Sequence, residues 1–122
     1  MLARTTLPAP VGNGLPDTGV VVSVCPEQWG GWTGRPGLEG HRAGRDWAPC
    51  FEVRRISLDG HDVSAEDPVV HTGRVLTVEA ADDAAGLSVA ITLEMEPSGL
   101  VRARARLRND RDGVYQLGSL AV

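Results

Sequence analysis

The sequence contains no lysine, so that all 12 of its basic residues are arginines, and it has only two cysteines. Aromatic residues are scarce as well, with three tryptophans, one tyrosine and one phenylalanine. Acidic residues outnumber basic ones, and the formal net charge is -4. A negatively charged chain repels phosphate groups, which argues against nucleic acid and against an anionic membrane surface as partners.

Features that would indicate secretion, membrane insertion or a metal site are also missing. Cys25 and Cys50 form no CxxC motif, and no histidine stands at a spacing typical of zinc sites. No apolar run approaches the roughly 20 residues that span a membrane, and the N-terminus lacks the apolar segment of a signal peptide. We therefore expect free thiols, a cytoplasmic location, and neither a metal ion nor an organic cofactor.

Catalytic signatures are equally absent from the sequence. No HExxH, GxSxG or P-loop motif occurs, and the histidines His41, His61 and His71 are scattered over stretches typical of loops. The aspartates lie mostly in turn-like stretches, where their side chains bond the local backbone. By its own residues the chain does not resemble a complete enzyme, and we predict no catalytic residue in it.

What the sequence does contain is a series of short segments with the period of β-strands. Its 122 residues suit one domain, and no segment has a convincing helical period. We predict an irregular leader over residues 1–18 and a single antiparallel β-sandwich domain over 19–122, with a Trp- and Gly-rich loop at 25–50 inserted between strands. The predicted strands cover residues 20–24, 51–58, 74–80, 87–96, 101–108 and 114–122.

The alternation is clearest on either side of Pro97-Ser98-Gly99. A three-residue hairpin loop there places Met95 opposite Val101, and Glu94 opposite Arg102, so that one face stays apolar. Such loops favour a left-handed residue at their end, which Gly99 supplies.

The strand at 51–58 changes phase in its middle. Phe51 and Val53 alternate in one phase, whereas Ile56 and Leu58 follow the opposite one. A β-bulge at Arg54-Arg55 would direct all four apolar side chains to the same face.

Four arginines at alternate positions form a stripe along the strand at 101–108: Arg102, Arg104, Arg106 and Arg108. Such a stripe could bind the successive phosphate groups of a nucleic acid. Because the net charge is negative and the preceding strand is acidic, we favour a solvated face that pairs with Glu94 and its neighbours across the hairpin.

The most unusual stretch is "GWTGRPGLEGHRAGRDWAP", residues 31–49, which holds two of the three tryptophans. Tryptophan rings stack on the apolar face of a sugar, and aspartate and arginine bond its hydroxyl groups. This combination suits a carbohydrate ligand. The alternative is that the large aromatic residues only plug the end of the sandwich, namely Trp29, Trp32, Trp47 and Phe51.

The stretches "GWTGRPGLEGHRAGRDWAPCFEV" and "GLVRARARLRNDRDGVYQLGSL" resemble the N-terminal β-sandwich domain of bacterial α-galactosidases of glycoside hydrolase family 36, in particular its branch from high-GC bacteria. The resemblance covers roughly residues 20–122. It implies a retaining enzyme that releases terminal α-galactose with two carboxylates about 5 Å apart. Both would lie on a following (β/α)₈ barrel, which needs about 250 residues and has no room in this chain.

The resemblance also implies site residues. The family's sandwich domain carries an aspartate in a Gly-Asp-Phe motif that bonds the galactose, and its counterpart here is Asp46, in Gly-Arg-Asp-Trp. Trp47 would replace the phenylalanine, and the other residues expected along the loop wall are Arg45, Trp32 and Trp29. The implied role is a non-catalytic wall of a galactose site with homo-oligomer contacts, in a sandwich that is incomplete in this chain. A free-standing carbohydrate-binding module and a ligand-free interaction domain remain alternatives.

Overall fold

The computed structural model describes residues 3–4, 21–22, 24–30, 34–64 and 72–122. Within these ranges the strands form three antiparallel sheets, which confirms the predicted all-β, antiparallel fold. The elements are β1 (Ala3–Arg4), β2 (Val21–Val22), the 3-10 helix η1 (Gln28–Gly30), β3 (Leu38–His41), β4 (Glu52–Leu58), β5 (His61–Asp62), β6 (Val75–Asp82), β7 (Leu87–Met95), β8 (Val101–Asn109) and β9 (Gln116–Leu120).

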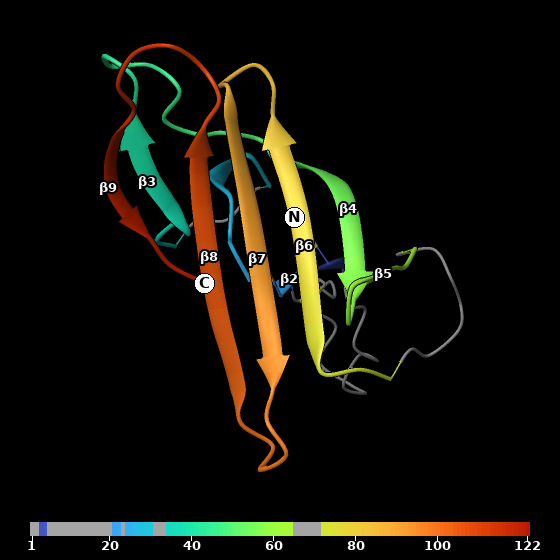
Figure 1. Ribbon diagram of the computed structural model, residues 1–122. Coiled ribbons are helices and arrows are strands. Elements are labelled where there is room, and N and C mark those ends of the chain that lie inside the picture. The colour runs from blue at the N-terminus through green and yellow to red at the C-terminus, as the bar shows by residue number, and fades with distance from the viewer. Residues whose placement is uncertain (1–2, 5–20, 23, 31–33, 65–71) are drawn as a thin grey trace, which may run out of the picture.

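The main sheet has five strands in the order β5-β4-β6-β7-β8, and the two smaller sheets are the pairs β3-β9 and β1-β2. Figure 1 shows the main sheet face-on, with β3 and β9 at the left of the view next to β8. Because β3 precedes the main sheet in sequence and β9 follows it, this pairing joins two segments that lie far apart in the sequence.

The hairpin of β7 and β8 has the predicted register. Met95 pairs with Val101 and Glu94 with Arg102. The amide of Glu96 donates to the carbonyl of Leu100 at 2.8 Å, which leaves a loop of three residues. Gly99 closes that loop with a φ of 86°, in the left-handed region that the sequence predicted for it.

The predicted bulge in β4 is present. The pairing of β4 with β6 shifts between Val53 and Arg55, so that Arg54 has no direct partner across the ladder. One extra residue reverses the alternation. Ile56 and Leu58 therefore face the same side of the sheet as Val53.

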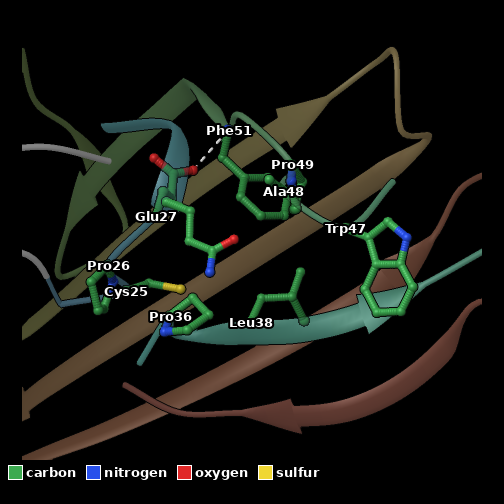
Figure 2. A pocket seen from close by; sticks show the side chains of 10 residues that line it. Cys25, Pro26, Glu27, Pro36, Leu38, Trp47, Ala48, Pro49 and Phe51 are labelled. Atoms are coloured by element: carbon green, nitrogen blue, oxygen red, sulfur yellow. Dashed lines mark hydrogen bonds between the residues drawn. The ribbon is translucent and has the colours of Figure 1, made fainter. Parts of the chain in front are cut away.

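The core lies between this apolar face of the main sheet and the pair β3-β9. Leu87, at the start of β7, is its most deeply buried side chain, with 1% exposed. Figure 2 shows Leu38 of β3 and Phe51 pointing into one space in front of the main sheet. The buried cluster consists of Cys25, Leu38, Phe51, Ala80, Ala85, Leu87, Val89 and Ile91.

Two sequence-based boundaries need comment. The segment 25–50, expected to be a loop throughout, contains β3, which forms by pairing with β9 rather than from any alternation of its own. Most of the predicted leader lies outside the described residues, and its described part, β1, pairs with β2. The leader and domain boundaries therefore stay predictions.

We predict that Leu87→Ala lowers the free energy of unfolding by about 3 kcal/mol, because the change leaves a cavity in the core. Met95→Ala is the matched control, since Met95 lies on the same strand and face but is 54% exposed, and it should cost less than about 1 kcal/mol. Urea unfolding measures both. Equal losses would contradict the placement of the core at the Leu87 end of the sheet.

Candidate functional site

The segment that follows β3 folds back on itself in a tight hairpin, His41–Trp47. Arg42 and Arg45 exchange two backbone hydrogen bonds, of 2.8 and 3.0 Å. The two residues between them, Ala43 and Gly44, have φ values of 47° and 77°. Positive φ at both central positions is the geometry of a type I′ turn. The hairpin therefore has a defined conformation, although it lies in a stretch expected to be a loop.

Trp47 is exposed and yet fixed by the hairpin. Its side-chain Nε1 donates to the carbonyl of Gly44 at 2.8 Å, and its ring lies 4.4 Å from that of His41, tilted by 35°. His41 is held in turn, because its Nδ1 accepts the amide of Gly44 at 3.2 Å. Since Trp47 is still 58% exposed, it presents an ordered aromatic surface to solvent.

Asp46 adopts a left-handed backbone conformation, with φ at 59°. Aspartate tolerates this region better than most residues. Its side chain is 25% exposed, and Oδ2 lies 3.5 Å from Nε of Arg42. The backbone carbonyl of Asp46 accepts a hydrogen bond of 3.4 Å from the hydroxyl of Tyr115. No hydrogen bond or ion pair from the described part of the chain reaches Oδ1.

Arg42 joins the hairpin to the connection between β8 and β9. Its Nη2 donates to Oδ1 of Asn109 at 2.6 Å and to the carbonyl of Ala85 at 3.4 Å. Its Nη1 donates to the carbonyl of Asp112 at 3.2 Å and, more weakly, to that of Gly113 at 3.5 Å. The side chain is only 12% exposed. These contacts hold the hairpin against a segment that lies far away in sequence.

The predicted site residues are only partly brought together. Asp46 and Trp47 are neighbours in the hairpin, and Arg45 contributes backbone bonds while its side chain is exposed. Trp29 lies in η1 with 72% of its surface exposed, and no contact joins it to Trp47 in the described residues. Trp32 lies outside them.

The hypothesis that the large aromatic residues plug the sandwich fits one of them. Phe51 is buried in the core, whereas Trp29 and Trp47 are exposed. Sequence reasoning also missed residues of the site: His41 was taken for an exposed loop histidine, and neither Arg42 nor Tyr115 was singled out. The turn-forming pair Ala43-Gly44 between two arginines was the one local signal for the hairpin.

A small cavity lies behind the hairpin, between Cys25, Leu38, Phe51 and Pro49 (Figure 2). Its volume of about 10 Å³ is no more than one water needs. A sugar ring is therefore excluded from it, and any ligand of this region must contact the outer surface of the hairpin. Burial raises the pKa of the Cys25 thiol, and Glu27 adds to this effect. Cys25 and Cys50 are both free thiols.

One arginine of the stripe on β8, Arg102, takes part in the expected ion pairs across the hairpin. Arg102 lies 3.6 Å from the carboxylate of Glu94 and 3.4 Å from that of Glu96. Arg108 pairs with Asp110. The same polar face carries an open groove of about 400 Å³ that Arg54, Arg106 and Arg108 line. Among the described residues there is no cluster of three or more potential metal ligands and no helix long and apolar enough to cross a membrane.

Comparison with known proteins shows the family. A family model described as the glycosyl hydrolase family 36 N-terminal domain matches residues 4–122. An α-galactosidase from Escherichia coli is 34% identical over 117 residues, which make up 96% of this chain but only 15% of that protein. No solved structure matches the chain. The chain belongs to the N-terminal domain family of glycosyl hydrolase family 36.

Proposed function

We propose that this chain is the non-catalytic N-terminal portion of an α-galactosidase and that its hairpin, His41–Trp47, forms one wall of the galactose site. The observation that carries the proposal is Trp47, which is held by two contacts and is nevertheless 58% exposed. Ordinary packing does not require an ordered, exposed indole. The family match and the similarity to an α-galactosidase support the choice of sugar.

The chemistry of the hairpin suits the binding of a sugar. The indole of Trp47 offers an apolar surface for the C–H face of a pyranose ring. Oδ1 of Asp46 accepts hydrogen bonds from hydroxyl groups, and these are strengthened by its charge. The exposed guanidinium of Arg45 supplies donors beside them.

The proposed role is binding and not hydrolysis. A retaining glycosidase needs a second carboxylate about 5 Å from the first, whereas the other ionisable side chains of the hairpin belong to His41, Arg42 and Arg45. In this proposal the catalytic pair lies in the remainder of a longer enzyme. The E. coli relative is long enough for that arrangement, since the matched region is 15% of its length.

One observation favours the alternative of a free-standing carbohydrate-binding module. The contacts that order Trp47 and Asp46 all come from within this chain. The aromatic surface therefore exists before any second domain covers it. The affinity of the chain alone for sugar distinguishes the two proposals, because a single wall binds weakly and a module binds measurably on its own.

Homo-oligomer contacts and a cytoplasmic location also form part of the proposal. Support for self-association comes from the loop end of the β7-β8 hairpin, where Met95, Leu100 and Val101 are exposed. Met95 and Val101 pair on the face that forms the core elsewhere in the sheet. Free thiols at Cys25 and Cys50 support a reducing compartment.

Titration with galactose, followed by NMR, tests the wall. We expect shifts confined to the Trp47 indole N–H and the Asp46 amide, with a dissociation constant on the order of 10 mM or weaker, because one wall buries little of the sugar. Asp46→Ala and Trp47→Ala should remove these shifts, and Arg104→Gln should preserve them. Saturation at micromolar galactose would favour the module instead. No shift at high millimolar galactose would overturn a sugar contact of any kind.

Sedimentation tests the oligomer contact. We expect the native chain to self-associate at about 100 μM and the variant Met95→Ser/Val101→Ser to remain monomeric, because the change replaces two of the three exposed apolar side chains at the hairpin end. Val114→Ser is the control, since Val114 is 77% exposed but lies outside that surface. A monomeric native chain would contradict the proposed contact.

A further inference from the structure

Arg42 has surroundings that are unusual for a nearly buried cation. Its terminal nitrogens, Nη1 and Nη2, bond only neutral acceptors: the Asn109 side-chain amide and the backbone carbonyls of Ala85, Asp112 and Gly113. Within the described residues, the carboxylate that pairs with it is that of Asp46, which faces Nε instead. The guanidinium is thus held by neutral acceptors at Nη1 and Nη2, and its ion-pair partner in the part of the chain that the structure describes, Asp46, lies at Nε.

The contact between Arg42 and Asp46 is an ion pair without a hydrogen bond. The distance of 3.5 Å between Nε and Oδ2 is that of an ion pair, and Nε is a buried donor without a hydrogen-bond partner. An unpaired buried donor is costly, and the nearby negative charge of the Asp46 carboxylate reduces that cost. The pair therefore restrains where Asp46 points.

Tyr115 restrains the same residue through the backbone. Its hydroxyl donates to the carbonyl of Asp46, and the guanidinium carbon of Arg42 lies 5.9 Å from the centre of its ring. The ring of Tyr115 also packs closely against β3 at Gly40. A Cβ added to Gly40 would lie only 2.5 Å from Cε1 of Tyr115. Asp46 is thus restrained at its side chain by Arg42 and at its main chain by Tyr115.

We propose that Arg42 is the positioning residue of the hairpin, which holds one carboxylate oxygen of Asp46 and so directs the other oxygen to the sugar. This inference rests on the proposed function. Arg42 would contact no sugar itself and would act through Asp46. Lysine could not replace it, because a single ammonium group cannot bond the four acceptors of Nη1 and Nη2 and also face the Asp46 carboxylate as Nε does.

The sequence provides a built-in probe of this arrangement, because Tyr115 is the one tyrosine of the chain. Burial raises the pKa of the Tyr115 hydroxyl, the charge of Asp46 raises it further, and the charge of Arg42 lowers it. Arginine keeps its charge over the range in which tyrosine titrates. The absorbance of tyrosinate therefore reports on both members of the pair without any ligand.

We expect Arg42→Gln to raise the Tyr115 pKa above that of the native chain and Asp46→Asn to lower it. Arg104→Gln is the charge-matched control and should leave it unchanged, since Arg104 lies on β8 and has no ion pair within the described residues. Folding favours the neutral phenol. The contribution of Tyr115 to the free energy of unfolding is therefore fully present below a pH of about 10 and is lost as the pH rises through the Tyr115 pKa of the folded chain. That loss should be smaller in Asp46→Asn.

The sugar titration tests the positioning itself. Arg42→Gln should reduce the galactose-induced shift of the Trp47 indole about ten-fold, as Asp46→Asn does, and the double variant should be no weaker than either single one. Additive losses, or an unchanged response in Arg42→Gln, would overturn the proposal. If Arg42→Gln fails to fold, Asn109→Ala removes the 2.6 Å anchor of Arg42, together with the bonds of Asn109 to Gly113 and Arg111, and should change both readouts in the same direction.

The two proposals fail in different ways. If the native chain shows no galactose response, the proposed function falls, and the Tyr115 pKa of the double variant still decides whether Arg42 and Asp46 act as a pair, because additive shifts would mean that neither residue depends on the other. If galactose shifts Trp47 but Arg42→Gln alters neither the shift nor the Tyr115 pKa, the wall stands and Arg42 is not its positioning residue.

Discussion

The pairing of β3 with β9 is the constraint on which the candidate site depends. His41, the last residue of β3, pairs with Gln116, the first of β9. The hairpin that begins at His41 therefore lies next to the segment that leads into β9, which supplies Tyr115 and the carbonyl groups that receive Arg42. Without this pairing the hairpin would keep its type I′ turn but lose the contacts that restrain Asp46.

The site combines local strain with compensating contacts. A left-handed conformation costs an ordinary residue about 1–2 kcal/mol. The type I′ turn requires this conformation at Ala43, a position where glycine would adopt it without that cost. The bonds of Trp47 to Gly44 and of Gly44 to His41 act against this cost. A segment ordered in advance loses less entropy when a ligand binds, so the strain is consistent with a binding surface.

The parts of the fold that could be predicted from sequence are the local ones. The β7-β8 register followed from alternation and Gly99, and the bulge at Arg54 followed from a change of phase. β3 was missed because Leu38 is the one large apolar residue in its four, and because its partner strand follows the whole main sheet in sequence. Pairing over such a separation leaves no local pattern.

In the site, too, only the features that are local in sequence could be predicted. Asp46 and Trp47 were expected from the resemblance to a family, and they adjoin in sequence. Arg42 and Arg45 are the same residue type in the same hairpin, yet Arg42 is nearly buried and Arg45 is exposed. The difference arises from Asn109 and the turn after it, which no pattern around Arg42 could indicate.

The shape of the surface decides between a wall and a complete site. Specific small-molecule sites bury most of their ligand, whereas the cavity behind the hairpin holds about one water and Trp47 is 58% exposed. In the proposed site, one indole and one carboxylate oxygen would orient a sugar without enclosing it. Such a surface gains affinity only when a second surface closes over the ligand, which is what a longer enzyme would supply. For this reason we propose one wall of a shared site rather than an independent module.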